Sequence, residues 1–451
     1  MQVNTRNVIL DILLEVNEKE QYVNLVLSDA LRKYQYLSHT ERAFISHVVL
    51  GSVERKITLD YVIDSFSKVK VKKMKPLIRN IMRMSVYQIL YMEGTADFAV
   101  CNEAVKLAAT RGFSTLKGFV NGVLRNIVRN KQNISYPDRG SSDFLSVKYS
   151  VPQWLTDMWL QAYGYENTVS MLDSQFAKRA LTIRCNMALT TPDELAERLT
   201  NQGISVKRSS HVNEALMISG YDYLEGLAEF NEGLFTVQDA SSMLVKYAAS
   251  PKPGDKVIDV CAAPGGKSLH IAEVIGSEGH IEARDISYAK TALIEENIAR
   301  MHFNNIDTCV ADAMEFDCEW ENKADIVIAD LPCSGLGILN KKPDIKYHAS
   351  QEGTEELAKL QRKILGVVSR YVKPGGTLVY STCTVNPAEN TENALHFAGQ
   401  SGFEIINLKS VIPESIYDCL TEDGFVEIRP GMLDNEFDGF FIAGFKKQEK
   451  I

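Results

Sequence analysis

Two cysteines and an aspartate follow apolar runs in the C-terminal half of the chain, where they could act together in covalent chemistry. The run Ile326–Ala329 is followed by Asp330 and then Cys333, and the run Thr377–Tyr380 is followed by Cys383. We predict that both runs are neighbouring parallel strands, whose carboxyl ends open into one cleft. A free cysteine is usually a small buried hydrophobe. Two of them beside a carboxylate do not suit a core, so the set indicates a reaction site.

Methylation at carbon 5 of a pyrimidine is a reaction that needs such a set, because this carbon is not nucleophilic by itself. A thiolate adds to carbon 6 and an acid protonates N3, which makes an enamine that can attack a methyl sulfonium. A base then removes the proton from carbon 5 and the thiolate leaves, so that one difficult step becomes several easier ones. Asp330 is the candidate acid if burial keeps it partly neutral. Its alternative role is that of a ligand to S-adenosylmethionine.

A glycine turn precedes these residues in the sequence. The segment 256–268 reads KVIDVCAAPGGKS, which predicts a strand, a tight turn and a helix. Gly265 and Gly266 allow a ligand to approach the backbone, and the N–H groups at the helix start favour oxygen ligands. A P-loop would require glycine where Cys261 stands, and the dinucleotide fingerprint GxGxxG is absent. An S-adenosylmethionine pocket remains, beside the alternative of an ordinary glycine-rich turn.

Two further acidic residues stand at predicted strand ends. Asp285 ends the strand after the glycine turn, where a carboxylate can accept both ribose hydroxyls of an adenosine. Asp312 ends the next strand, near the expected position of an adenine amino group. Each alone is more often a turn aspartate, but at successive strand ends they support a nucleoside pocket.

Composition indicates a protein of two or three domains without a membrane span. The chain has 451 residues, of which 45% are hydrophobic, and no apolar run approaches the ~18 residues of a span. The opening run Val8–Val16 is interrupted by Asp11 and Glu15, which argues against a signal peptide, so we expect a cytoplasmic protein. The eight cysteines form no CxxC pair, so we expect thiols and no metal site.

Charge is distributed unevenly along the chain. The net charge is −9, yet residues 1–130 hold 19 Lys and Arg against 12 Asp and Glu, or +7. The five lysines within Lys68–Lys75, together with Lys117, Arg125 and Arg129, are candidate phosphate contacts of an RNA-binding surface. Solvated helix faces and a lysine-rich loop are the alternative.

The pattern of the first 235 residues predicts two domains joined by a linker. Apolar residues at helical spacing predict an all-α domain over residues 1–130, in which Ser38 and Glu41 form a capping box. Residues 131–144 are a predicted linker. Residues 145–235 predict a ferredoxin-like module, with helices at 151–163 and 191–202 and strands at 181–185, 206–209 and 215–219.

The remainder, residues 236–447, predicts an open, doubly wound and mostly parallel α/β sheet. Helical runs are expected between the first five of its strands. The predicted strands are Val257–Val260, His280–Ile286, Thr308–Ala311, Ile326–Ala329, Thr377–Tyr380, Glu404–Ile406 and Phe440–Phe445.

Several of these motifs together resemble a known family. DVCAAPGGK, DLPCSG with KKPDIKY, STCTVNPAEN and the closing FDGFF resemble the RNA cytosine-5 methyltransferases of the RsmB/Sun (Fmu) type, which act on bacterial 16S ribosomal RNA. The resemblance spans the chain: the first domain resembles their NusB-like RNA-binding domain and the second their ferredoxin-like module. Gln238, Asp239, Ser241 and Ser242 fit the family's segment before the glycine turn.

The resemblance implies a Rossmann-like class I S-adenosylmethionine-dependent methyltransferase domain and assigns roles to its residues. Cys383 in the TC motif is expected to be the nucleophile and Cys333 in the PC motif to assist product release, the reverse of the arrangement in DNA cytosine methyltransferases. The residues expected to contact the cofactor are Cys261, Ala262, Ala263, Pro264, Gly265, Gly266, Lys267, Asp285, Asp312 and Asp330. Arg284 and Leu331 depart from the family's pattern without removing a required group.

The resemblance also implies a substrate. This is the cytosine usually numbered 967 of 16S ribosomal RNA, either naked or in an early assembling small subunit, with the enzyme acting as a monomer. Two alternatives stay open on the sequence: a P-loop-like ATPase, and a noncatalytic RNA-binding factor of ribosome assembly.

Overall fold

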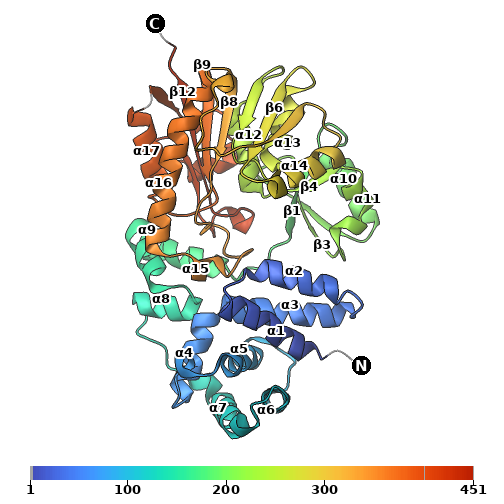
Figure 1. The fold of residues 1–451 in the computed structure, drawn as a ribbon, viewed down its shortest axis with the longest axis vertical. Coiled ribbons are helices and arrows are strands. Elements are labelled where there is room, and N and C mark those ends of the chain that lie inside the picture. Colours follow the sequence, from blue (N-terminus) through green and yellow to red (C-terminus); the bar gives the residue numbers. More distant parts are fainter. Residues whose placement is uncertain (1–3, 401, 450–451) are drawn as a thin grey trace. The chain divides into compact units, whose positions relative to one another are not determined.

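The computed structural model describes residues 4–400 and 402–449. Residues 1–3 and 401, which fall within the predicted first and third domains, lie outside the described residues. The chain divides into two compact units, which are described separately (Figure 1). A helical unit comprises residues 1–173 and the later segment 339–350, and a sheet unit comprises residues 174–338 and 351–451.

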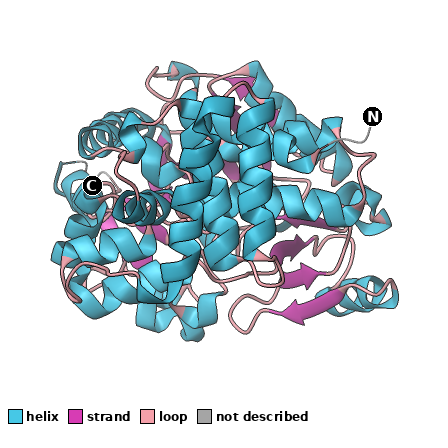
Figure 2. Ribbon diagram, turned by 90° about the horizontal axis from the view of Figure 1, so that it is seen from below, coloured by secondary structure: helices cyan, strands magenta, loops and turns pink. Residues whose placement is uncertain are grey.

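The helical unit has one large apolar core, built from faces that repeat at helical spacing. Its described residues contain helices and no strands (Figure 2). The predicted capping box is confirmed, because Ser38 and Glu41 bond to each other's backbone N–H at the start of α3. The helices are α1 Thr5–Glu18, α2 Val23–Lys33, α3 His39–Glu54, α4 Lys56–Phe66, α5 Pro76–Tyr91, α6 Asp97–Thr110, α7 Lys117–Asn130, α8 Ser142–Tyr149, α9 Gln153–Ser174 and α15 Ile345–His348.

The stretch after α7 contains more helix than its turn-forming sequence suggests. A 3₁₀ turn covers Lys131–Asn133, and Ser141 caps α8, which begins within the predicted linker. Helix α9 is interrupted at Gly164, whose φ of +76° is not helical. The domain boundaries expected from the sequence, at residues 1–130, 145–235 and 236–447, stay predictions.

The sheet unit begins with a ferredoxin-like module, which confirms the predicted architecture. Its elements are β1 Leu181–Cys185, α10 Pro192–Asn201, β2 Ser205–Arg208, β3 Ala215–Ser219, α11 Ala228–Asn231 and β4 Phe235–Val237. The strands are antiparallel in the order β2-β3-β1-β4. Strand β4 was not predicted, because an isolated apolar run of three residues carries no periodicity.

The second sheet has eight strands, and its mostly parallel, doubly wound architecture is confirmed. Seven strands follow the order β10-β12-β9-β8-β5-β6-β7, and β11 pairs with β12. The pairs from β9 to β7 are parallel, whereas β12 is antiparallel to β9 and β10. The strands are β5 Lys256–Asp259, β6 His280–Asp285, β7 Ile306–Val310, β8 Ala324–Asp330, β9 Val372–Thr382, β10 Phe403–Ile406, β11 Val426–Ile428 and β12 Phe440–Lys447.

Helices cover this sheet, with one departure from the sequence prediction. They are α12 Ala240–Ala249, α13 Gly266–Ile275, α14 Tyr288–Arg300, α16 Gln351–Val368 and α17 Thr391–Gln400. The expected helix between β7 and β8 is wrong: this connection holds only the 3₁₀ turn Cys318–Trp320. Its sequence, DAMEFDCEWENK, is too short and too polar to build an apolar helix face.

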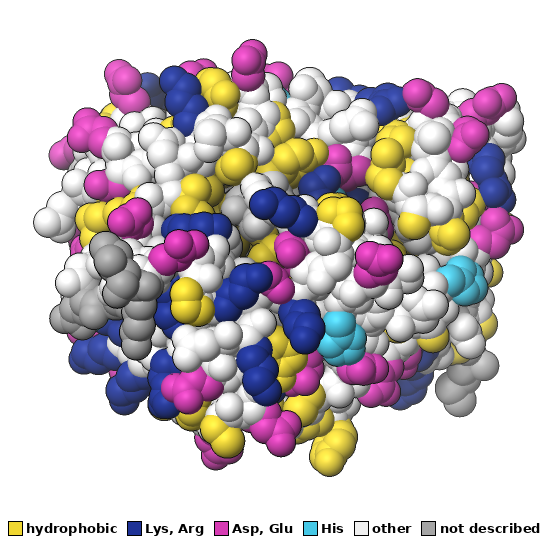
Figure 3. All heavy atoms as spheres, turned by 90° about the horizontal axis from the view of Figure 1, so that it is seen from above, with side chains coloured by type: hydrophobic (Ala, Val, Ile, Leu, Met, Phe, Trp, Pro, Cys, Tyr) yellow, Lys and Arg dark blue, Asp and Glu magenta, His cyan; other side chains and the backbone are white. Residues whose placement is uncertain are grey.

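The sheet unit has an apolar core and a charged surface. Two apolar clusters pack on the sheet. On the face shown in Figure 3, Lys and Arg side chains are interspersed with Asp and Glu. Among the described residues, no helix combines the length and the apolar character that crossing a membrane requires.

Candidate functional site

Two thiols meet where β8 and β9 end. These strands run parallel with Asp330 opposite Ser381, so the loops after them leave the same edge of the sheet. The sulfur atoms of Cys333 and Cys383 lie 3.4 Å apart, and both residues are partly exposed. The hydrogen bond with Cys383, together with burial, raises the pKa of the Cys333 thiol well above its ordinary value. The hydrogen bond and burial therefore disfavour the thiolate form of Cys333.

An ion pair lies beside the thiols at the end of β8. Lys267 Nζ donates to Asp330 Oδ2 at 2.6 Å, and Ser381 Oγ donates to Asp330 Oδ1 at 2.6 Å. Burial alone would lower the pKa of Lys267, but the Asp330 carboxylate outweighs it and, with a contribution from Cys383, raises the pKa. Asp330 is 26% exposed, and each of its oxygens accepts one hydrogen bond, Oδ2 from Lys267 and Oδ1 from Ser381.

The predicted glycine turn joins β5 to α13. Gly265 has a φ of +101°, and a Cβ at this position would lie 3.1 Å from Ile294 Cγ2, so glycine is required. No described side chain caps α13, which leaves the N–H groups of its first turn open to an oxygen ligand. Asp259, at the end of β5, is 1% exposed and accepts from Ser268 Oγ through Oδ2. Its Oδ1 has no hydrogen-bond partner among the described residues, so this oxygen can accept from a polar ligand.

The backbone of the turn itself is fixed by two short hydrogen bonds. Ala262 N donates to Arg284 O at 2.8 Å, and Gly265 N donates to Ala262 O at 2.7 Å. Burial raises the pKa of the Cys261 thiol above its usual range. Burial therefore disfavours the thiolate form of Cys261. The stretch Cys261–Lys267 thus presents backbone and one cation, Lys267, to the same strand end.

The two other predicted acids occupy different surroundings. Asp285 is buried, accepts from Ala263 N at 3.0 Å and pairs with Lys290 Nζ at 2.9 Å, so it lies directly against the glycine turn. Asp312 accepts from Met314 N at 2.8 Å, which is a local turn bond. The structure therefore brings Asp285 to the glycine turn, and Asp312 bonds within its own loop.

Comparison with known proteins identifies the family. Residues 246–446 match the family described as 16S rRNA methyltransferase RsmB/F, residues 3–129 the NusB family, and residues 151–221 the ferredoxin-like domain of RsmF/B-like methyltransferases. A Bacillus subtilis protein named probable ribosomal RNA small subunit methyltransferase B is 34% identical over 99% of both chains. The chain belongs to this methyltransferase family. A Synechocystis protein of the same name is 32% identical over 99% of this chain and all of its own.

Solved structures agree with this assignment. The crystal structure of PH0851 matches with a TM-score of 0.82 and 25% identity, over 99% of this chain and 100% of that one. The chain is an S-adenosylmethionine-dependent RNA methyltransferase. Its glycine turn is therefore the turn of a methyltransferase, and the P-loop-like ATPase is set aside.

Sequence reasoning missed the residue that holds the two thiol loops of this methyltransferase together. Glu389, which is fully buried, accepts hydrogen bonds from Ser334 N at 2.9 Å and from Ser334 Oγ. It also accepts from Gln361 Nε2 at 3.0 Å and Asn386 Nδ2 at 2.9 Å. Gln361 in turn donates to Pro332 O at 2.9 Å. Both carboxylate oxygens are thus engaged, and the loop after Cys333 is tied to the loop after Cys383. The only sequence signal was an acid inside the motif NPAEN.

A close backbone approach further fixes the thiol loops. Gly337 N donates to Cys383 O at 3.1 Å, and Gly439 N donates to Gly337 O at 2.9 Å. A Cβ on Gly337 would lie 2.2 Å from Gly439 O, so no other residue fits. This contact explains why the closing motif FDGFF of this methyltransferase lies at the thiol loops.

The predicted phosphate contacts lie in the helical unit. The five lysines within Lys68–Lys75 are all exposed, around a short 3₁₀ turn before α5. Arg125 and Arg129 line a cavity of about 330 Å³ together with Phe98, which is 70% exposed. Cations beside an exposed aromatic ring are typical of surfaces that contact single-stranded RNA.

Proposed function

We propose that this methyltransferase transfers a methyl group to carbon 5 of a cytosine in 16S ribosomal RNA, through a covalent adduct with Cys383. The observation that carries the proposal is the pair of sulfur atoms, 3.4 Å apart at the ends of two adjoining strands. Methylation of an oxygen or a nitrogen needs no thiol, whereas carbon 5 needs a nucleophile at carbon 6. The substrate follows from the names of the relatives, and position 967 follows from the family resemblance.

The reaction begins with attack by the Cys383 sulfur on carbon 6. A cation stabilises a thiolate, and the Lys267 ammonium is close enough to Cys383 for the two charges to interact. Carbon 5 becomes nucleophilic and takes the methyl group that S-adenosylmethionine supplies when bound. Transfer of the proton from carbon 5 to a base, water or hydroxide, restores the double bond and expels the Cys383 thiolate. Cys333 lies beside Cys383 and is assigned to this release step.

Two features of the glycine turn fit the cofactor. The first turn of α13 offers uncapped N–H groups, and Asp259 Oδ1 is a buried acceptor without a hydrogen-bond partner among the described residues. We assign Cys261–Lys267 to the backbone side of the pocket, and Asp285 and Asp312 to the nucleoside. Because Asp330 is paired with Lys267, it is better suited to accept hydrogen bonds from cofactor or base than to act as an acid at N3.

The helical unit is assigned to RNA binding. Its exposed lysines and the cavity beside Phe98 are the features that support this assignment. Phosphate contacts give affinity without base specificity. We therefore propose that these contacts dock the RNA, in the cytoplasm, either naked or in an assembling subunit.

The decisive experiment is transfer of labelled methyl from S-adenosylmethionine to unmodified, protein-free 16S RNA, followed by mapping of the product. We expect a single 5-methylcytosine at position 967. A label on another atom or nucleotide would contradict the assigned reaction or site. Failure with naked RNA and success with assembling subunits would identify the particle as substrate. Cofactor binding without transfer to any RNA would favour the noncatalytic assembly factor.

Two cysteine variants test the division of labour. Cys383→Ala should abolish transfer and adduct formation while S-adenosylmethionine still binds, because only the nucleophile is lost. Cys333→Ala should retain the first half of the reaction and accumulate a covalent RNA adduct, visible as a band that survives denaturation. Normal transfer by Cys383→Ala, or an adduct that requires Cys333, would reverse the assignment.

A further inference from the structure

One segment of the chain lies in sequence within the sheet unit and folds with the helical unit. Residues Leu339–Ser350, which we call the strap, begin six residues after Cys333 and end where α16 starts. They pack in the same compact unit as residues 1–173. The chain therefore runs directly from a reacting thiol into the helical unit and back.

The strap is held by caps on the ends of helices. Asp344 is 1% exposed, and its Oδ2 accepts from Val23 N at 2.7 Å. Val23 is the first residue of α2, whose own N-cap residue, Tyr22, makes no side-chain cap. The first N–H groups of a helix lack partners within it and favour a negative charge. Asp344 thus supplies the cap that the local sequence of α2 lacks.

Tyr347 joins the ends of three more helices. Its Oη lies 3.0 Å from the carbonyl oxygen of Glu54, the last residue of α3, and 3.0 Å from that of Ser150, which ends α8. Ser150 Oγ lies 2.9 Å from Tyr347 Oη and accepts from Ile57 N at the start of α4. The Lys56 ammonium stands 3.9 Å from the centre of the Tyr347 ring. One hydroxyl group therefore closes a hydrogen-bonded junction of α3, α4 and α8.

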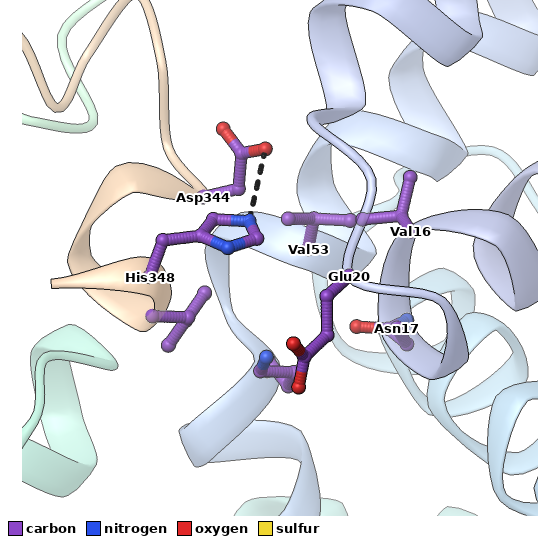
Figure 4. Close-up of a pocket in the computed structure, with 8 residues that line it drawn as sticks. Val16, Asn17, Glu20, Val53, Asp344 and His348 are labelled. Atoms are coloured by element: carbon purple, nitrogen blue, oxygen red, sulfur yellow. Dashed lines mark ion pairs between the residues drawn. The ribbon is translucent and has the colours of Figure 1, made fainter.

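The cap bonds, and not packing alone, determine where the strap lies. A cavity of about 280 Å³ separates part of the strap from the helices, with Asp344 and His348 on one side and Val16, Val53 and Glu20 on the other (Figure 4). His348 Nε2 is 3.8 Å from Asp344 Oδ2. This space leaves the strap room to shift if a cap bond is lost.

The stretch that precedes the strap is fixed to the backbone of the thiol loops. Gly337 is bonded to the backbone of Cys383 and to Gly439. Asp344 is seven positions after Gly337, a span of roughly 25 Å at most. A displacement at the helix caps can thus reach the thiol loop through a short piece of chain.

We propose that the strap couples the helical unit to the thiol loop, and that Asp344 and Tyr347 are positioning residues which act through Cys333. The proposed function places the RNA on the helical unit. RNA binding there would therefore affect the position of Cys333, the residue assigned to product release. The inference rests on the proposed function for the role of Cys333.

The variant Tyr347→Phe removes one hydroxyl group and keeps the ring. We expect kcat for methyl transfer to fall about tenfold, the effect of one lost buried hydrogen bond. KM for RNA should stay within about twofold, because the phosphate contacts are untouched. The slowed step should leave a covalent RNA adduct, as in Cys333→Ala. A rise in KM with kcat unchanged would overturn the proposal.

Tyr61→Phe is the matched control. Tyr61, on α4, donates through Oη to Ser135 O at 2.9 Å, a bond at an exposed position of the same helical unit and not to the strap. Tyr61→Phe also removes one tyrosine hydroxyl group, so equal falls in kcat for both variants would show a general structural effect and overturn the proposal. We expect kcat of Tyr61→Phe to match the wild type.

A double variant tests whether Tyr347 acts through Cys333. In the Cys333→Ala background, where release is already blocked, Tyr347→Phe should leave the rate of adduct formation unchanged, since coupled residues are not additive. Slower adduct formation in the double variant would overturn the proposal.

A thiol-modification assay separates this inference from the proposed function. Iodoacetamide labelling of Cys333 and Cys383, followed by mass spectrometry of the peptides, needs no methyl transfer. We expect Tyr347→Phe to change the labelling rates at least threefold and Tyr61→Phe to leave them unchanged; unchanged rates in both overturn the coupling even if transfer occurs. If Tyr347→Phe does not fold, Asp344→Ala, which removes the bond to Val23 N, takes its place with the same criteria. If the wild type transfers no methyl group, the proposed function fails and the labelling result still decides the coupling.

Discussion

Two buried carboxylates of this methyltransferase hold segments that lie far apart in the sequence, and they hold them differently. Glu389, at the thiol loops, accepts four hydrogen bonds that engage both of its oxygens, one of them from Ser334 N. Asp344, in the strap, accepts from Val23 N through one oxygen. Its other oxygen has no hydrogen-bond partner within the described part of the chain. Both carboxylates are almost completely buried.

The difference separates a scaffold from a coupling element. A buried carboxylate with every lone pair engaged is costly to move, because each lost bond leaves a desolvated polar atom. A buried carboxylate with only one oxygen engaged has fewer hydrogen bonds to lose, so moving it costs less free energy. Glu389 therefore fixes the geometry of the thiols, whereas Asp344 suits a segment whose position responds to its surroundings.

The variant Glu389→Gln is expected to have the largest effect among substitutions of the buried carboxylates Glu389, Asp259 and Asp344. The glutamine side chain has an NH₂ group in place of one carboxylate oxygen. This donor would face the donors that the oxygen of Glu389 accepts from. Hydrogen bonds to charged groups contribute about 1.5–3 kcal/mol each, so protection of the Ser334 amide against hydrogen exchange should fall about 100-fold. Methyl transfer should fall with it, because the Cys333 loop loses its anchor. Glu392→Gln, at an exposed position of α17, is the control, and equal exchange in both variants would remove Glu389 from the scaffold.

Asp259 offers a test on a half-satisfied carboxylate in the sheet unit. Burial raises its pKa from 3.8 to about 7, although Ser268 and Lys267 act in the opposite direction. Between these two pH values the folded chain holds a proton that the unfolded chain has lost. Stability should therefore fall as the pH rises from about 4 to about 7, by up to about 1.4 kcal/mol per pH unit.

The measurement is the thermal midpoint of the wild type relative to Asp259→Asn, taken at steps from pH 5 to pH 8. The difference should decline with pH and level off above about pH 7. Asp307→Asn, which alters an exposed side chain on β7, should follow the wild type. A flat difference for Asp259→Asn would mean that this carboxyl is ionised throughout and is satisfied by a partner.

Much of the sheet unit could be predicted from the sequence, because buried parallel strands are continuous apolar runs. The run Ile326–Ala329 lies inside β8, and the glycine turn follows β5. Short elements could not be predicted: β4 and β11 have three residues each. The polar connection between β7 and β8 was expected to be helical and is a 3₁₀ turn, because no apolar face holds a helix there.

The strap and the thiol scaffold were beyond sequence reasoning for a different reason. Lys346 is fully buried, although its neighbours in KKPDIKY suggest a solvated loop. Asp344 and its partner Val23 are 321 residues apart, and Glu389 collects donors from three segments. Local patterns carry propensity and periodicity, and they carry no information on which distant backbone group a carboxylate will reach.

The variant Asp344→Asn is expected to have the smallest effect and addresses the comparison directly. Its amide oxygen can still accept from Val23 N, so only the charge at the start of α2 is lost, a change of about 0.3–1 kcal/mol. Protection of the Val23 amide against hydrogen exchange should fall no more than about fivefold, far less than that of Ser334 in Glu389→Gln. Asp29→Asn removes the same charge from an exposed position of α2 and should leave the Val23 amide unchanged. If protection of the Val23 amide fell as much as that of the Ser334 amide, the Asp344 cap would be as costly to disturb as the Glu389 network. The contrast between a fixed scaffold and a strap that can shift would then be wrong.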